Sequence, residues 1–193
     1  RAFSLAGELL LPRAIFISKL DRERAEFDST LADVKKSLSD KVVAAQLPIG
    51  KEDKFTGVVD LVAMKACRYK TDGSGDFAIE PIPADLVEAA NKAHETLVDA
   101  VAASDDALTE KYLEAGDLTA QELTAGLNKA IRMGSVVPAF CGSGTRNVGA
   151  AQILDFVVQS FPSPIECGSK KGKTAKGEEL DVAPEPAAPF SAQ

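Results

Sequence analysis

Two short polar segments of this chain could form a binding site. Residues 18–21 (Ser-Lys-Leu-Asp) follow the apolar residues 14–17, and residues 142–144 (Gly-Ser-Gly) follow the apolar residues 136–140. In the first segment, the Asp21 carboxylate can accept hydrogen bonds from two donors that lie side by side. In the second segment, glycine lets a ligand approach the backbone N–H groups closely. Each segment ends an apolar run, so both are predicted at the ends of strands.

The elements around these segments follow the order of an open α/β sheet. Residues 1–11 and 27–38 have apolar side chains at helical spacing, and residues 13–17 and 136–140 read as buried strands. A closing helix follows the second strand. This order of helix, strand, loop and helix predicts an α/β fold. In such sheets ligands bind at the carboxyl ends of strands, which is where the two polar segments stand.

A segment of different character separates the two sheet regions. Asp21 and Ser143 are 122 positions apart (143 − 21). The intervening sequence predicts short strands at 42–48, 55–62 and 64–69, followed by a turn at 71–75. Three helices are then predicted, at 83–103, 106–114 and 120–133, with Gly134 as the cap of the last. We interpret this block as an inserted α+β subdomain.

The two polar segments resemble the guanine loops of GTPases. Residues 18–21 resemble the motif Asn-Lys-x-Asp, whose aspartate accepts hydrogen bonds from the N1–H and the N2 amine of guanine, a donor pair that adenine lacks. The lysine of that motif lays its aliphatic stem along the base. Residues 142–144 resemble the second loop, whose backbone N–H groups contact the guanine oxygen. The resemblance assigns guanine binding to Ser18, Lys19, Asp21, Ser143 and Gly144. Taken singly, each segment can also be read as an ordinary polar turn.

Almost the whole chain resembles elongation factor G. The resemblance rests on an ordered series of segments: FTGVVDLVAMKA at 55–66, KYLE at 111–114, NVG at 147–149 and FPSP at 161–164. It implies the remainder of a P-loop GTPase domain with an inserted α+β subdomain. The expected divisions are the second half of the GTP-binding domain (1–40), the insert (41–134), the last strand and helix of the GTP-binding domain (135–164) and a linker (165–193).

The resemblance also implies a function. Elongation factor G is a multidomain GTPase that acts on the ribosome in translocation and recycling. We therefore expect a parent protein that binds GTP or GDP, with its Mg²⁺ site in the missing part. Its partners would be the ribosome, including ribosomal RNA, and the stalk protein, which contacts the insert. A β-barrel domain would begin just after Pro189 and Phe190. The family usually has asparagine at Ser18 and alanine at Gly144, and these departures favour a divergent paralogue.

The phosphate-binding half of a GTPase site is not found in this sequence. A P-loop, G-x-x-x-x-G-K-[ST], and a magnesium-binding aspartate are needed for hydrolysis, and neither occurs in the right context. Residues 168–174 (GSKKGKT) are one residue short of the motif and follow no predicted strand, so they are interpreted as a basic linker. The chain begins with Arg1 rather than Met, and we expect a fragment. It is predicted to be inactive alone, with no catalytic or metal-binding residue of its own.

Composition narrows the remaining possibilities. There are 22 Lys and Arg against 29 Asp and Glu, and the formal charge of −7 argues against a nucleic-acid-coating protein. No apolar run of membrane-spanning length and no signal peptide is found, so no membrane association is expected. The three cysteines lack a pairing pattern, which favours reduced thiols and a cytoplasmic location. His94 is predicted at a surface or edge position, and Cys141 as a small buried residue.

Other interpretations stay open at this point. The chain could be an excised, non-catalytic module that binds the ribosomal stalk. It could also derive from another ribosomal GTPase, of the release-factor or tetracycline-protection type. In the family topology, the strand at 14–17 lies beside a strand encoded upstream. An unpaired apolar edge favours pairing with another chain, so self-association is expected.

Overall fold

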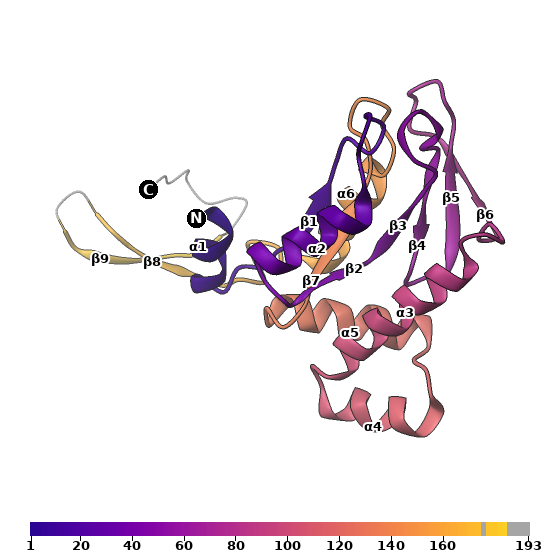
Figure 1. Ribbon diagram of the computed structural model, residues 1–193. Helices are drawn as coiled ribbons and strands as arrows, with labels where there is room; N and C mark the ends of the chain where they lie inside the picture. Colours follow the sequence, from indigo (N-terminus) through magenta and orange to yellow (C-terminus); the bar gives the residue numbers. More distant parts are fainter. Residues whose placement is uncertain (175–176, 185–193) are drawn as a thin grey trace. The chain divides into compact units, whose positions relative to one another are not determined.

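The computed structural model describes residues 1–174 and 177–184, leaving out the side chain of Lys170. The chain divides into two compact units, residues 1–160 and 161–193. The first unit contains every element from α1 to α6, and the second contains the strands β8 and β9 (Figure 1).

A three-stranded parallel sheet carries the polar segments identified in the sequence. Its strands are β1 (Ile15–Ile17), β2 (Val42–Ala44) and β7 (Val137–Cys141), in the order β1-β7-β2. Helix α2 (Phe27–Ser37) connects β1 to β2, and the sheet is accompanied by α1 (Ala2–Glu8) and α6 (Ala150–Ser160). The mixed α/β architecture expected from the sequence is confirmed.

The core of this sheet is built around its central strand. Every residue of β7 is buried, because a central parallel strand is covered on both faces. Val42, Val137 and Ala139 form the centre of the cluster, and the partly buried side chains packed against it are Phe3, Ile15, Leu31 and Val34. The apolar side chains whose spacing predicted the helix at 27–38 therefore pack against the sheet, as Leu31 and Val34 do.

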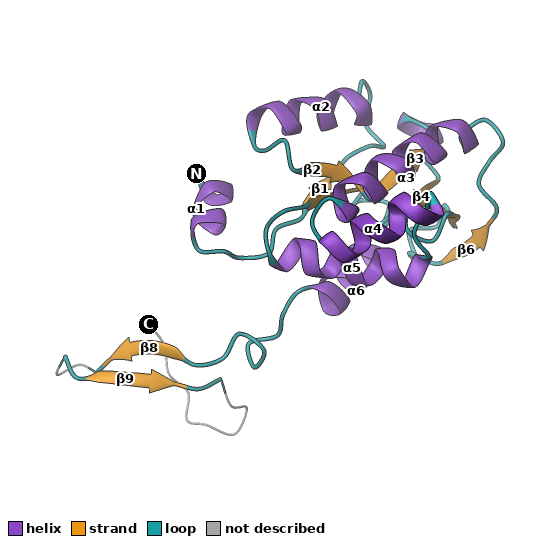
Figure 2. Ribbon diagram, turned by 90° about the horizontal axis from the view of Figure 1, so that it is seen from below, coloured by secondary structure: helices purple, strands orange, loops and turns teal. Residues whose placement is uncertain are grey.

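The second sheet is antiparallel and lies within the first unit. Its strands are β3 (Gln46–Ile49), β4 (Gly57–Asp60), β5 (Lys65–Tyr69) and β6 (Phe77–Glu80), in that order. A single 3₁₀ turn, η1 (Glu52–Lys54), joins β3 to β4. The helices that follow are α3 (Val87–Ala102), α4 (Asp106–Ala115) and α5 (Ala120–Arg132). Figure 2 shows these three helices gathered together.

The junction between the two sheets differs from the expectation. Residues 42–48 were predicted as one strand of the insert, but β2 belongs to the parallel sheet and β3 to the antiparallel one. Ala45 stands between them: its N–H donates to the Ala139 carbonyl (2.8 Å), and its carbonyl accepts from the Leu61 N–H (3.1 Å). One residue thus serves both sheets, and the boundary expected at residue 41 does not coincide with the change of sheet.

Smaller differences from the predicted elements have local causes. Strand β6 was not predicted. Helix α3 begins at Val87 rather than at Pro83, because the preceding residues form a turn in which the Leu86 N–H donates to the Pro83 carbonyl (2.9 Å). Residues 170–173 and 179–182 pair as the antiparallel strands β8 and β9 of the second unit, inside the expected linker. The segment 168–174 therefore lacks the strand–loop–helix context of a phosphate loop. Pro189 and Phe190 lie outside the described residues.

Polar caps fix the helix ends of the insert. The Asp105 side chain accepts from the N–H groups of Ala107 and Leu108 at the start of α4. At the start of α5, Thr119 and Glu122 form a reciprocal capping box. Gly134, with φ of +69°, follows α5 as the sequence predicted.

The capping box predicts an acid-sensitive contribution to stability. The hydrogen bond from Lys111, followed by those from Thr119, lowers the pKa of Glu122 from 4.5 to about 2. Because the folded pKa is depressed, the ionised carboxylate stabilises the fold above pH 4.5, and this stabilisation is lost as the pH falls toward 2. Glu122→Gln keeps the side-chain length but not the charge. We expect the difference in free energy of unfolding between wild type and Glu122→Gln to shrink across that pH range in urea titrations. A difference that stays constant between pH 4.5 and pH 2 would contradict this contribution of Glu122.

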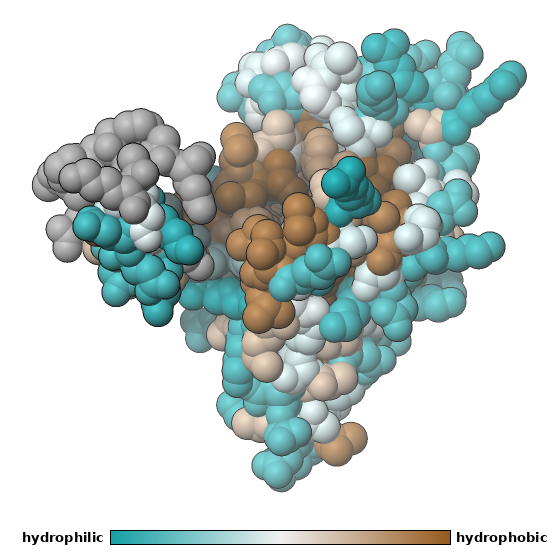
Figure 3. Space-filling model, turned by 90° about the vertical axis from the view of Figure 1, so that its left-hand side faces the viewer, coloured by the Kyte–Doolittle hydropathy of each residue, from teal (hydrophilic) through white to brown (hydrophobic). Residues whose placement is uncertain are grey.

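The sheet edge predicts self-association. Strand β1 is an edge strand of the described sheet, and Figure 3 shows hydrophobic side chains gathered on one face of the molecule. Large exposed apolar side chains of the first unit include Leu5, Leu10, Leu154 and Val158. We expect concentration-dependent association in sedimentation velocity, weakened by Val158→Lys, because edges and apolar patches of this kind favour pairing. A single monomer boundary at every concentration would contradict the expectation.

Candidate functional site

The parallel pairing of β1 and β7 brings the two polar segments together. Ile17 and Cys141, the last residues of these strands, are register partners. Beyond them, the Gly142 N–H donates to the Ile17 carbonyl (3.0 Å) and the Leu20 N–H donates to the Gly142 carbonyl (3.3 Å). Leu20 is 4% exposed and anchors the first loop in the core. The segments at 18–21 and 142–144 are therefore adjacent loops at one edge of the sheet.

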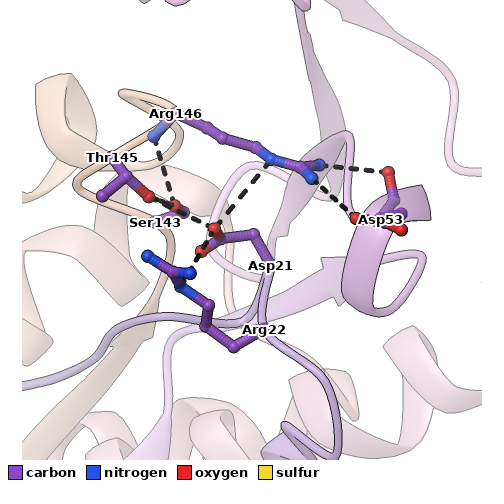
Figure 4. Close-up of polar contacts among 6 residues, drawn as sticks. All are labelled: Asp21, Arg22, Asp53, Ser143, Thr145 and Arg146. Carbon is purple, nitrogen blue, oxygen red and sulfur yellow. Dashed lines mark hydrogen bonds and ion pairs between the residues drawn. The ribbon is translucent and has the colours of Figure 1, made fainter.

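Asp21 lies at the centre of this edge (Figure 4). Its side chain is only 8% exposed. Its Oδ2 accepts a hydrogen bond from the Thr145 hydroxyl (3.2 Å) and lies 4.0 Å from the Nε of Arg146. The hydrogen bond from the Ser143 hydroxyl is the main reason that the pKa of Asp21 falls below its usual value, and Thr145 and Arg146 add to it. Asp21 is thus a buried carboxylate held in its ionised form.

The second oxygen of this carboxylate, Oδ1, differs from Oδ2 in its hydrogen bonding. Asp21 Oδ1 is buried and has no hydrogen-bond partner among the described residues. An unpaired buried acceptor costs about 1–3 kcal/mol, and more when it is charged. Native structures tolerate few such atoms, and each requires an explanation. A ligand that offers an N–H donor to Oδ1 would remove this cost, which makes Asp21 suited to accept from two adjacent donors.

The second loop has backbone N–H donors without an acceptor in the described part of the chain. Ser143 is fully buried, and its N–H and carbonyl bond those of Val148 (both 2.9 Å), which closes the loop. Its hydroxyl accepts from the Arg146 N–H (3.3 Å) and contacts the Thr145 hydroxyl (3.1 Å). Gly144 and Thr145 are exposed at the tip, and no acceptor for their backbone N–H groups is found in the described part of the chain.

A third element, η1, was not foreseen from the sequence. The Glu52 N–H donates to the Leu20 carbonyl (3.1 Å), and the Glu52 carboxylate accepts from the Arg24 N–H (2.7 Å). The Arg146 guanidinium donates to the Asp53 carbonyl (3.0 Å) and to its carboxylate (3.2 Å). Asp53 and Arg146 are 93 residues apart, so no sequence pattern links them. The turn, which belongs to the antiparallel sheet region, is therefore hydrogen-bonded to the segments that follow both β1 and β7.

Backbone strain is concentrated around the same loops. Six residues other than glycine have a positive φ in the described chain, and four of them lie in η1 or in the β1–α2 and β7–α6 connections that contain the two loops: Lys19, Arg24, Glu52 and Asn147. Such conformations cost on the order of 1 kcal/mol or more each and cluster at functional sites. The bracing hydrogen bonds hold this strain in place.

Only some of the predicted site residues contact other residues through their side chains. Asp21 and Ser143 meet directly, with Thr145 and Arg146 as neighbours that sequence reasoning missed, although both follow Gly144 in the polar run after β7. Ser18 and Lys19 are exposed, and no side-chain hydrogen bond or ion pair of theirs is found among the described residues. They are therefore placed at the site but not fixed by protein contacts.

Two residues outside the site can be compared with their predictions. His94 is not a free surface group: its side chain is 15% exposed, and its Nδ1 contacts the Leu61 carbonyl (2.6 Å), which ties α3 to the residue after β4. Cys141 is buried, as predicted, and burial raises the pKa of its thiol. Because its pKa is raised, the thiol stays protonated and unreactive.

Neither a metal cluster nor a membrane helix occurs in the part of the chain that the structure describes. No group of three or more His, Cys, Asp or Glu residues there could hold a metal ion. None of the described helices combines the length and the apolar character needed to cross a bilayer.

Comparison with known proteins establishes a shared fold. No protein-family model matches the sequence. A crystal structure of a protein from Thermus thermophilus superposes with a TM-score of 0.76 and 28% sequence identity, over 88% of this chain. This chain spans 25% of the length of that protein. The α/β architecture described above is thus that of part of a longer known structure.

Replacing Gly142 and Gly144 by alanine is expected to change the free energy of unfolding in opposite directions. A Cβ at Gly144 would meet nothing within 4 Å, whereas one at Gly142 would lie 2.3 Å from the Val148 carbonyl oxygen and 2.7 Å from the Phe16 ring. Gly144→Ala should raise the free energy of unfolding by about 0.4–1 kcal/mol, because alanine restricts the unfolded chain. Gly142→Ala should lower it by about 1–3 kcal/mol through overpacking. Chemical denaturation of both variants measures the contrast, and equal effects would contradict the described loop.

Proposed function

We propose that this chain supplies guanine recognition to a GTP-binding protein that resembles elongation factor G. The observation that supports this most is the state of Asp21. One oxygen of the carboxylate accepts a hydrogen bond from the Thr145 hydroxyl of the second loop, while the other is buried without a partner among the described residues. Both loops stand at the carboxyl ends of adjacent parallel strands, where α/β sheets bind ligands.

The groups present fit the edge of guanine. The N1–H and N2 amine of guanine would donate to Asp21, and the unused N–H groups of Gly144 and Thr145 would donate to the guanine oxygen. The stem of Lys19 would cover the face of the base. Adenine would present an acceptor to the carboxylate and an amine to the N–H groups, so both contacts would be lost. Sites that rely on buried polar partners reject such analogues strongly.

In this proposal the chain contributes to a larger enzyme. The complete protein would bind GTP and Mg²⁺ and hydrolyse GTP on the ribosome, in translocation or recycling. The insert would contact the ribosomal stalk protein, and the full protein would contact ribosomal RNA. The ordered segments that resemble elongation factor G support this, together with the fold shared with part of a longer Thermus protein. Without a phosphate loop, the chain alone would bind nucleotide through the base and would not hydrolyse it.

A change of base preference tests the proposal. Asp21→Asn replaces one carboxylate oxygen by an N–H donor, so it should favour xanthine, which carries an oxygen in place of the N2 amine. We expect wild type to bind GMP at least about tenfold more tightly than XMP, a difference of ~1.4 kcal/mol, and the variant to reverse this order. NMR titrations of the chain with GMP, XMP and AMP at millimolar concentration measure both affinities.

A control variant distinguishes the loss of the guanine contact from the loss of one negative charge. Asp33→Asn removes the same charge from an exposed position of α2 and should leave the preference for GMP unchanged. Equal binding of GMP and AMP by wild type, or an unaltered preference in Asp21→Asn, would refute guanine recognition by this site.

A further inference from the structure

One cavity of the described chain does not include Asp21 in its lining. It has a volume of about 860 Å³ and opens between α2, α3, β3 and the turn that contains η1. Its lining includes partly buried apolar side chains, of which Leu31 comes from α2, Leu47 and Pro48 from β3, and Ala93 from α3. We call it the α2–α3 groove. Its apolar floor offers contact area to a ligand with apolar groups.

The rim of the α2–α3 groove is basic, in a chain whose formal charge is −7. Two acidic residues, Asp28 and Asp85, line the groove, against five basic ones, which are Lys35, Lys51, Lys54, Arg68 and Lys92. The positive charge at this groove therefore opposes the overall charge of the chain.

Three of these cations are not neutralised by the described part of the protein. Lys51 is paired with Glu26 (2.6 Å) and Arg68 with Glu80 (3.0 Å). For Lys35, Lys54 and Lys92, no ion pair or side-chain hydrogen bond is found among the described residues. They come from three separate elements, α2, η1 and α3. An anionic occupant of the groove would be attracted by the positive charge of these lysines.

The lining also indicates the chemical class of the occupant. A single-stranded nucleic acid would need aromatic side chains on which its bases could stack, and no aromatic residue is among the described residues that line the groove. A small hydrated anion would not use the apolar floor. A peptide with acidic and apolar side chains uses both features. From Ala89 to Thr96, α3 lines about 10 Å of the groove, which is enough for about two turns of a bound helix.

We propose that the α2–α3 groove is a docking site for an acidic, amphipathic segment of a partner protein. Apolar side chains of the segment would lie on Leu47, Pro48 and Ala93, as in other helix-in-groove complexes. Its carboxylates would face Lys35, Lys54 and Lys92, where complementary charge sets specificity and association rate. This interaction does not involve Asp21 and is independent of nucleotide binding.

A designed peptide tests the groove directly. The probe is a fluorescein-labelled 18-residue peptide with glutamate and leucine at amphipathic helical spacing, titrated with the whole chain in fluorescence anisotropy. We expect saturable binding that weakens with added salt, and at least a tenfold loss of affinity in Lys54→Glu and in Lys92→Glu. Replacing the glutamates of the peptide by glutamine should cause a similar loss.

Matched variants locate the binding surface. Lys35→Glu should weaken binding, whereas Lys36→Glu, the same charge change at the next residue of α2 but outside the groove, should leave it within about twofold. Asp21→Asn should bind the peptide as wild type does. Urea titrations confirm that each variant is folded under the assay conditions.

Four outcomes would overturn the proposal. The first is the absence of saturable peptide binding to wild type. The second is equal loss of affinity in Lys35→Glu and Lys36→Glu. The third is tighter binding of a labelled 16-nucleotide oligouridine than of the peptide, which would assign the groove to nucleic acid. The fourth is a loss of self-association in Lys54→Glu in sedimentation, which would make a second copy the occupant.

Discussion

The parallel pairing of β1 with β7 is the interaction on which the candidate site depends. It joins strands from opposite ends of the first unit and pairs Ile17 with Cys141. Closing so long a loop costs entropy, but that cost grows only slowly with loop length. The buried valines and alanine at the centre of the sheet compensate for it through apolar burial. Only this pairing puts Asp21 beside Ser143.

The antiparallel sheet is tied to the same site through backbone atoms. Ala45 bonds to Ala139 with its N–H and to Leu61 with its carbonyl, so neither sheet can shift at this residue without breaking a hydrogen bond. Arg146 adds a second tie through Asp53. Because the Asp53 side chain is 98% exposed, its ion pair contributes little stability, and the more lasting part of the contact is the hydrogen bond to its carbonyl.

The turn after β3 contributes to both candidate binding regions. Glu52 and Asp53 contact the loops around Asp21, where one carboxylate oxygen has no donor. Gly50, Lys51 and Lys54 of the same turn line the α2–α3 groove, where lysines lack acidic partners. A short 3₁₀ segment with a strained Glu52 thus forms a wall shared by two candidate binding regions.

The sequence by itself determined the helices and most strands, because apolar spacing is a local property; α2 and β7 were placed to within one residue. It also marked Asp21 and Ser143, since polar groups directly after buried strands are visible in the chain. The split of residues 42–48 between two sheets was decided by the tertiary structure, because only one residue, Ala45, separates the two halves and their partner strands come from distant segments. The same holds for Arg146, Asp53 and the basic groove, whose members come from distant elements and meet only when the chain folds.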